Sequence, residues 1–276
     1  MATTKNAAAP AKKSGFKGIK NAIWILVICG VVAYTFYFKV LGASENFAGG
    51  DPAGHPVNLM GTVYKGGFVV GLILTLLLSV ICLGVERFFA LRAAFGTMSL
   101  GKFTIQVKEY IKAGKFDEAT ALCNKMKGSV ANVVLASITA YKDAEANNTL
   151  KKAQKIAKIQ QAHEEATQLE MPTLQMNLPI VATIVTLGTL TALFGTVTGM
   201  IKSFAALASG GGGDSVALST GISEALINTA LGILTSWLAV VSYNFFSNRI
   251  DKLTYALDEV GYTIAATYDV NHTTEA

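Results

Sequence analysis

The chain has 276 residues, of which 51% are hydrophobic and only 15% charged, with a mean hydropathy of +0.44. Because a soluble domain carries about 25% charged residues, this composition excludes an ordinary soluble protein and indicates that much of the chain lies in lipid. The net charge of +5 does not indicate nucleic-acid binding, since the basic residues stand in blocks that flank apolar runs. Three cysteines without CxxC or Cys/His spacing exclude a disulfide framework and a metal site.

Residues 1–21 form a polar, lysine-rich tail that we expect to be disordered and cytoplasmic. The apolar run NAIWILVICGVVAYTFYF follows directly, so residues 22–41 are either a membrane helix or a signal peptide. LGAS, at residues 41–44, resembles a weak cleavage site. The length of the run, and its aromatic end beside Lys39, are typical of a membrane interface and favour a retained transmembrane helix.

Residues 42–65 are rich in glycine and proline and have no Lys or Arg between Lys39 and Lys65. This pattern predicts a loop on the outer side of the membrane. Residues 66–85, GGFVVGLILTLLLSVICLGV, are uncharged. At about 1.5 Å per residue, a helix of this length spans the roughly 30 Å hydrocarbon core. Glu86 and Arg87 follow, which places the end of this second span in the cytoplasm.

Residues 86–177 form the main polar region, in which apolar residues recur with helical spacing. Gly114 and Gly128 are predicted to separate short helices. The segment LKKAQKIAKIQQAHEEATQLE predicts one long helix that leads to the next span, with Pro172 and Pro179 as candidates for starting or kinking it. Because this helix is charged on several faces, we expect His163 to be solvated.

Two further apolar runs, residues 178–205 and 216–247, predict the third and fourth transmembrane helices. Residues 206–215 connect them and contain ASGGGGDS. Glycines before an acid are compatible with a phosphate-binding loop, but the Walker lysine and a preceding strand are missing. We therefore expect a short outer hairpin. Residues 248–276 predict a cytoplasmic C-terminal helix or tail.

The distribution of lysine and arginine orients these four predicted spans. The N-terminal tail has five lysines, the region from Glu86 to Asn177 has thirteen Lys plus Arg, and the part after Ser247 has two. The two outer loops have none between their flanking lysines. By the positive-inside rule, both termini and the polar region lie in the cytoplasm.

Small and hydroxyl-bearing residues form one stripe along each of the last two spans. In the third span the stripe consists of Thr189, Ala192, Thr196, Gly199 and Ser203, with Gly195 beside it. In the fourth span it consists of Gly221, Ala225, Thr229, Gly232 and Ser236. Such residues at intervals of three and four let membrane helices approach closely and hydrogen-bond across the contact. Tight packing is one interpretation of the stripes and a pore lining is the other.

Glu224 lies in the fourth span, about 13 Å from its outer end, where an ionised acid costs about 2.5–3.5 kcal/mol. Thr220 and Asn228, one turn to either side, extend a polar strip beside the stripe. Lys202, at the outer end of the third span, is one candidate partner; otherwise the acid faces water or another subunit, or is protonated. The residues alone thus predict a polar seam that serves as an ion path or as a socket for a partner helix.

Four motifs resemble those of the MotA/TolQ/ExbB proton-channel family, over roughly residues 66–258. The two most specific are FGTVTGMIKSF, at residues 194–204, and GISEALINTALGILTSWLAVVSYNFF, at residues 221–246. VERF and GKFDEATALC, which begin at Val85 and Gly114, match the family pattern more weakly.

The resemblance implies an all-α integral membrane protein with four transmembrane helices, long helices that extend into the cytoplasm, and a homopentamer around a central pore. It also implies the bacterial inner membrane, where ion flow would move single-span ExbD/TolR-type helices inside the pore and act on a TonB-like protein. The family's two pore threonines map onto Thr196 and Thr229, and its glutamate maps onto Glu224. The three residues would line the ion path, with Glu224 tuning the local charge or gating access. The supporting seam would consist of Thr189, Gly195, Gly199, Thr220, Gly221, Ala225, Asn228 and Gly232.

Protons would be the coupling ion, although threonines at both pore positions are also compatible with sodium. We expect no cofactor, metal or nucleic-acid partner, and contact with membrane lipid. We also expect no enzymatic activity, because the sequence shows no Ser/His/Asp or Cys/His arrangement.

The chain departs from the family pattern in three respects. Thr189 stands near a position that is usually proline, Ala192 replaces a glycine, and the helix at residues 22–41 is an additional N-terminal span. The short C-terminal tail resembles ExbB or TolQ more than MotA. The greatest resemblance is to ExbB, which implies that the chain energises TonB-dependent outer-membrane transport. A TolQ-like subunit of a Tol–Pal envelope system and a non-conducting scaffold for a single-span partner are the alternatives.

Overall fold

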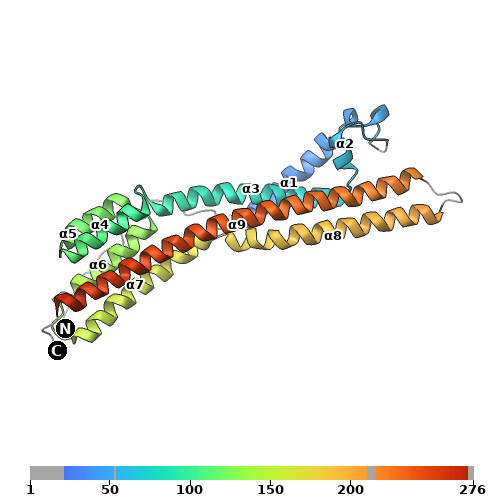
Figure 1. Ribbon diagram of the computed structural model, residues 1–276. Helices are drawn as coiled ribbons and strands as arrows, with labels where there is room; N and C mark the ends of the chain where they lie inside the picture. Colours follow the sequence, from blue (N-terminus) through green and yellow to red (C-terminus); the bar gives the residue numbers. More distant parts are fainter. Residues whose placement is uncertain (1–21, 53, 210–214, 273–276) are drawn as a thin grey trace, which may run out of the picture. The chain divides into compact units, whose positions relative to one another are not determined.

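The computed structural model describes residues 22–52, 54–209 and 215–272, in which nearly all regular structure is helical (Figure 1). The helices are α1 (Ala22–Phe36), α2 (Leu59–Tyr64), α3 (Phe68–Phe95), α4 (Leu100–Lys112), α5 (Phe116–Met126), α6 (Ser129–Ala146), α7 (Lys152–Gln175), α8 (Leu178–Ser209) and α9 (Ser215–Asn271). By length and composition, α1 with its extension, α3, α8 and α9 can each cross a membrane. The expectation of an all-helical chain with four long apolar helices is confirmed. The tail at residues 1–21, the glycine run at 210–214 and the last residues, 273–276, lie outside the described residues.

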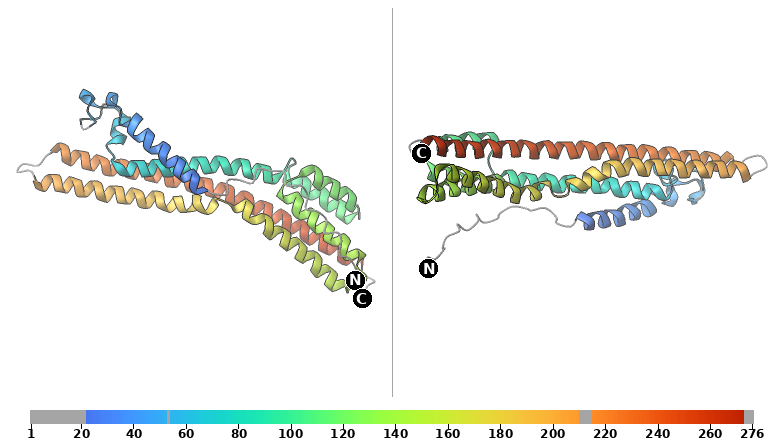
Figure 2. Two further views of the ribbon diagram at one scale, coloured as in Figure 1. Left: turned by 180° about the vertical axis from the view of Figure 1, so that it is seen from behind. Right: turned by 90° about the horizontal axis from the view of Figure 1, so that it is seen from below.

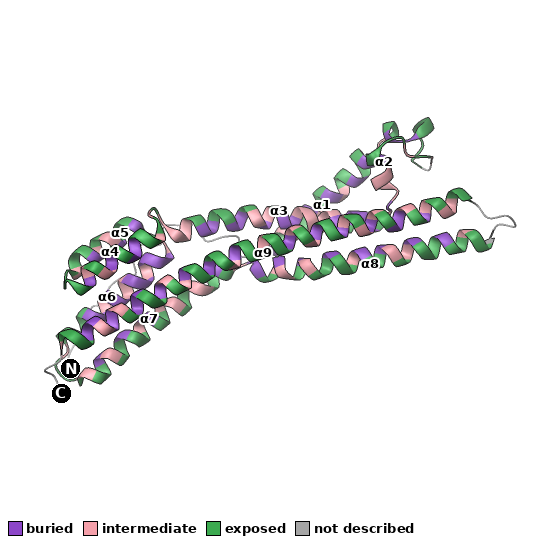
Figure 3. Ribbon diagram, in the orientation of Figure 1, coloured by how far each residue is buried: buried purple, intermediate pink, exposed green. Residues whose placement is uncertain are grey.

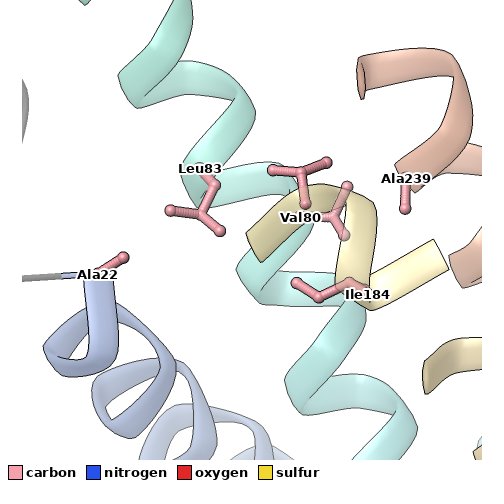
Figure 4. Close-up of a cluster of buried hydrophobic side chains, with 6 residues drawn as sticks. Ala22, Val80, Leu83, Ile184 and Ala239 are labelled. Carbon is pink, nitrogen blue, oxygen red and sulfur yellow. The ribbon is translucent and has the colours of Figure 1, made fainter. Parts of the chain in front are cut away.

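The chain divides into two compact units, and we call residues 22–86 and 177–245 the apolar unit. Its core brings together α1, α3, α8 and α9. The cluster consists of Ala22, Val80, Leu83, Val181, Ile184 and Ala239 (Figure 4). Because Ala22 and Ala239 are small, the helices that carry them come close to the larger Leu83 and Ile184, and the interior is filled.

The outward sides of α8 and α9 are also apolar, and Figure 3 shows exposed residues along both helices. On α8 the exposed large hydrophobic residues include Leu190, Leu193, Phe194, Val197, Ile201 and Phe204. A soluble protein rarely exposes so continuous an apolar surface. This surface therefore suits contact with lipid tails or with other membrane helices.

Aromatic and asparagine side chains order the connection between α1 and α3. α1 continues as a π-helical turn, Tyr37–Leu41, where Tyr37 stacks on Tyr64 of α2 with ring centroids 4.8 Å apart. The Tyr37 hydroxyl donates to the Tyr64 carbonyl oxygen at 3.0 Å. Asn46 donates to the carbonyl oxygens of the last two residues of the π-turn and accepts from Asn58 at 2.8 Å. These bonds fix the chain that leads into α3.

Residues 87–176 and 246–272 form the second unit, which we call the polar unit. It contains α4 to α7 and the last part of α9. Tyr141 of α6 meets Tyr268 of α9 edge to face, with ring centroids 4.9 Å apart. The Lys152 ammonium of α7 lies 2.7 Å from an Asp269 carboxylate oxygen of α9. Aromatic packing and ion pairs thus join the helices of this unit.

The break between α7 and α8 lies at Asn177, which has a left-handed φ of 66°. Pro179 stands in the first turn of α8, where a proline costs no intrahelical hydrogen bond. Of the two candidate prolines, Pro179 stands at the start of a helix, whereas Pro172 lies inside α7 and starts none. The buried Arg87 guanidinium donates to two carbonyl oxygens in the last turn of α7, at 3.4 and 3.5 Å. The positive charge of Arg87 stabilises the C-terminal end of α7, because the carbonyl groups at a helix C-terminus carry partial negative charge.

Gly114 and Gly128 separate α4, α5 and α6, as predicted, and both have positive φ.

Gly128 has a φ of 92°, and a Cβ there would lie 2.5 Å from the Ala94 carbonyl oxygen. We therefore predict that Gly128→Ala lowers the free energy of unfolding by about 1–3 kcal/mol. Gly101→Ala is the matched control, because a Cβ at this helical position has open space and should stabilise by about 0.5–1 kcal/mol. Thermal unfolding of the full chain in detergent micelles measures both changes, and equal midpoints would contradict this account.

Candidate functional site

The small-residue stripes of α8 and α9 face each other along the apolar unit, where the two helices lie side by side (Figure 2). A Cβ on either Gly199 or Gly221 would lie 2.8 Å from the carbonyl oxygen of the other. A Cβ on Gly232 would lie 2.8 Å from the Gly188 carbonyl oxygen. At these points the two backbones touch, so only glycine fits. The interpretation that the glycines serve tight packing is confirmed, and we call this contact the α8–α9 seam.

Paired hydroxyl groups lie between these glycine contacts. Thr196 and Thr229 bring their Oγ1 atoms to 2.5 Å of each other, and Thr189 Oγ1 lies 3.0 Å from Ser236 Oγ. Ser203, at the C-terminal end of the α8 stripe, is within hydrogen-bond distance of the Leu218 carbonyl oxygen across the seam at 3.2 Å. The seam therefore carries hydroxyl groups at about every second helical turn, between helices that are otherwise apolar.

The Thr196–Thr229 pair has more acceptors than hydrogens. Each hydroxyl also lies 3.0 Å from a carbonyl oxygen on its own helix, that of Ala192 or that of Ala225. Two hydroxyl hydrogens cannot serve three contacts, so one threonine donates to the other, which donates to its own helix. In the reverse arrangement the second threonine donates to the first, which then donates to the carbonyl oxygen of its own helix, and no heavy atom has to move. The pair thus has two near-equivalent hydrogen-bond arrangements.

Glu224 is buried on α9, with only 5% of the residue exposed, and is paired with Lys202 of α8. The Lys202 ammonium lies 2.7 and 2.9 Å from the two carboxylate oxygens. The structure thus selects one of the alternatives that the sequence leaves open for this acid. Because the ammonium satisfies both oxygens, the ionised acid no longer stands alone among apolar helices.

The turn before α3 covers the other side of Glu224. Gly67 has a φ of 76°, and a Cβ there would lie 2.5 Å from Glu224 Oε1. One residue earlier, the Gly66 carbonyl oxygen accepts from Asn228 Nδ2 at 2.9 Å. This glycine pair lies outside the site predicted from the sequence. Its one signal in the sequence is its position at the junction of the loop predicted at residues 42–65 and the second predicted span.

The structure brings together two of the three residues of the predicted polar strip. Glu224 and Asn228 both turn toward the start of α3, whereas the Thr220 hydroxyl donates to the Val216 carbonyl oxygen of its own helix. Asn228 is fully buried, with its side chain against Gly195, where an added Cβ would lie 2.5 Å from it. Its Oδ1 has no hydrogen-bond partner among the described residues. The strip is therefore a bracing contact to α3 that lies beside the hydroxyl pairs of the seam.

The Lys202–Glu224 pair predicts a measurable coupling energy. Removing the ammonium alone in Lys202→Met leaves a buried carboxylate without its cation, which costs more than removing both charges. In a double-mutant cycle with Glu224→Gln, we expect the double variant to be less destabilised than the sum of the single variants, by about 0.5–3 kcal/mol. Thermal unfolding of the purified full chain measures each corner of the cycle. Additive effects would show that the two side chains do not interact.

Comparison with known proteins finds a family resemblance over the part of the chain that holds this seam. Residues 130–259 match the model of the MotA/TolQ/ExbB proton channel family. The match includes α6, α7, α8 and the seam-forming part of α9, and it leaves α1 to α5 outside. The additional N-terminal helix therefore lies in the unmatched part of the chain.

Named relatives match over shorter stretches. The Tol-Pal system protein TolQ of Pseudomonas aeruginosa is 37% identical over 95 residues, or 34% of this chain and 41% of that protein. The putative biopolymer transport protein ExbB-like 3 of Synechocystis sp. is 33% identical over 87 residues, or 31% of this chain and 41% of that protein. The biopolymer transport protein ExbB of Salmonella typhimurium is 37% identical over 79 residues, or 29% of this chain and 32% of that protein.

The matched part of this chain spans between 32% and 41% of the length of these relatives. Relatives named TolQ and relatives named ExbB have similar identity. The resemblance expected from the sequence is confirmed, because residues 130–259, which hold the whole α8–α9 seam, match the MotA/TolQ/ExbB proton channel family.

Proposed function

We propose that this chain is the pore-forming subunit of an ion-driven motor in the bacterial inner membrane. Several copies, most simply five, would surround a single-span partner of the ExbD/TolR type, with both termini and the polar unit in the cytoplasm. The lysine distribution supports this orientation. The family match over the seam and the exposed apolar surface of α8 support the assembly in a membrane.

The hydroxyl pair at Thr196 and Thr229 is the observation that carries this proposal. Because the pair has two near-equivalent hydrogen-bond arrangements, a proton that reaches one hydroxyl allows another to leave from its partner. No charged side chain is needed at this point. Thr189 and Ser236 provide a second hydroxyl pair further along the same seam. The seam thus offers polar steps to a proton where the surrounding residues are apolar, and hydroxyl oxygens equally suit a sodium ion.

Glu224 has a different role in this proposal. Its carboxylate is held by Lys202 and covered by Gly67, so it acts as a fixed charge that braces α9 against α8 and α3. A titrating carboxylate on the single-span partner would carry the mobile proton. Ion flow past the seam would then move that partner helix relative to its surroundings.

We further propose an ExbB-type role, in which the motor energises TonB-dependent outer-membrane transport. A TolQ-type role in a Tol–Pal envelope system is the second candidate, and the 37% identity to the TolQ of Pseudomonas aeruginosa favours it to a similar degree. Expression of this chain with its own partner in bacteria that lack either system separates the two. Restored TonB-dependent uptake supports the first role, and restored resistance to detergent supports the second.

The hydroxyl pair makes a specific prediction for ion flux. We expect Thr196→Val and Thr229→Val each to lower proton flux about tenfold, equivalent to losing one hydrogen bond of about 1.4 kcal/mol at the barrier. Flux is measured in liposomes that contain the chain and its co-expressed partner, under an imposed pH gradient. Thr198→Val is the matched control, since its hydroxyl bonds to carbonyl oxygens of its own helix.

Complex assembly is checked for each variant by size-exclusion chromatography. Wild-type flux in both valine variants, with assembly intact, would rule out the hydroxyl pair as an ion step. If the intact wild-type complex carries no flux under any gradient, the chain is a non-conducting scaffold for its partner.

A further inference from the structure

His163 of α7 is buried in the polar unit, with 8% of the residue exposed. The expectation that it is solvated is therefore wrong. The charged residues of α7 indicated a helix surrounded by water, but α7 packs against both α6 and α9 at this point. Gly261 of α9 makes room for the ring, because a Cβ there would lie 2.5 Å from His163 Nε2 and 2.7 Å from Cε1. Because this Cβ would be almost equally far from Nε2, Cδ2 and Cε1, the face of the imidazole lies against the α9 backbone at Gly261.

The hydrogen bonds of Ser137 set the tautomer of this ring. Ser137 Oγ, on α6, donates to the Val133 carbonyl oxygen at 2.9 Å and lies 2.9 Å from His163 Nδ1. The tautomer with its hydrogen on Nδ1 satisfies both contacts: Nδ1 donates to Ser137 Oγ, the Ser137 hydroxyl donates to Val133, and Nε2 keeps the lone pair. Nε2 is buried and has no hydrogen-bond partner among the described residues. The contact is thus built for the neutral ring.

Protonation would place a hydrogen and a charge at the buried Nε2, where the described residues provide no acceptor. The groups that face His163 differ among the three helices. α7 contributes Glu164 and α9 contributes Asp258, whereas α6 contributes Ser137 and has no titratable side chain from residue 129 to residue 140. Burial lowers the pKa of His163 below its ordinary value of 6.5, and this effect is larger than the opposing effect of the two acids.

We propose that the contact between His163 and Gly261 is a proton-sensitive latch that holds α7 against α9 when the ring is neutral and releases it when the ring is protonated. The released imidazolium would turn toward Asp258 and Glu164, the two carboxylates that already act on it. The latch lies entirely within the polar unit, so it stands whether or not the chain conducts ions. In a motor driven by protons, it would make the polar unit responsive to acidification on its own side of the membrane.

The direction of the pH effect follows from linkage. Since the closed latch binds a proton more weakly than the open one, the contact is fully stable above about pH 6.5 and loses stability as the pH falls. For a single proton, the opening equilibrium constant rises up to tenfold for each pH unit below that value, until the pKa of the closed state is reached.

Hydrogen–deuterium exchange of the full chain in detergent micelles, at pH 7.5 and 5.5, measures this opening. After correction for intrinsic exchange rates, we expect protection to fall severalfold at pH 5.5 in peptides around Ser137, His163 and Gly261. The variant His163→Gln cannot titrate and should lose this dependence on pH. His272→Gln is the matched control, because His272 lies in the same unit, stacked on Tyr268, and its replacement should leave the effect intact.

Either of two results would overturn the proposal: wild-type protection that is the same at both pH values, or a pH effect of wild-type size in His163→Gln. If His163→Gln does not fold, an NMR titration of the wild-type histidines decides, with assignments taken from His55→Gln and His272→Gln. The proposal expects the pKa of His163 to lie below its ordinary value of 6.5. A midpoint for His163 at or above 6.5 contradicts it.

Discussion

The close approach of α8 and α9 is the constraint on which the rest of the site depends. Because Gly199 and Gly221 bring backbone against backbone, short side chains such as those of Thr196 and Thr229 reach across the gap. A leucine at either glycine position would separate the helices and pull the hydroxyl groups out of contact. In a membrane, where lipid tails are as apolar as the side chains, such packing and interhelical hydrogen bonds replace the hydrophobic effect as the source of helix association.

The close contact between α8 and α9 also explains how the chain tolerates an acid among apolar helices. Lys202 reaches Glu224 because the seam holds α8 beside α9, and Gly67 lets the start of α3 close over the carboxylate. The result separates two kinds of polar group in the apolar unit. Glu224 and Asn228 are committed to bracing contacts with neighbouring segments, whereas the hydroxyl pairs retain alternative hydrogen-bond arrangements. Only the hydroxyl pairs can assist ion movement without a large structural change.

The sequence predicted the helices and the stripes well, because both depend on residue type and spacing. It predicted the breaks at Gly114 and Gly128 for the same reason, since positive φ favours glycine. The sequence did not predict features that depend on which segments of the chain pack against each other. The burial of His163 requires a gap on α9 at Gly261, almost a hundred residues later in the chain. By contrast, the break between α7 and α8 falls at the predicted boundary of residues 177 and 178, where Pro179 is a local signal.

In the proposed complex the α8–α9 seam faces a hydrated ion path. Thiol accessibility measures this exposure in a variant whose three native cysteines, Cys29, Cys82 and Cys123, are replaced by alanine. A single cysteine is then placed at Thr196, at Thr229 or at Val197, and intact membranes are treated with a small, cationic, membrane-impermeant thiol reagent. We expect cysteines at Thr196 and Thr229 to react and their modification to block ion flux, while the cysteine at the exposed apolar position Val197 does not react. Reaction at Val197 with none at Thr196 or Thr229 would contradict this arrangement.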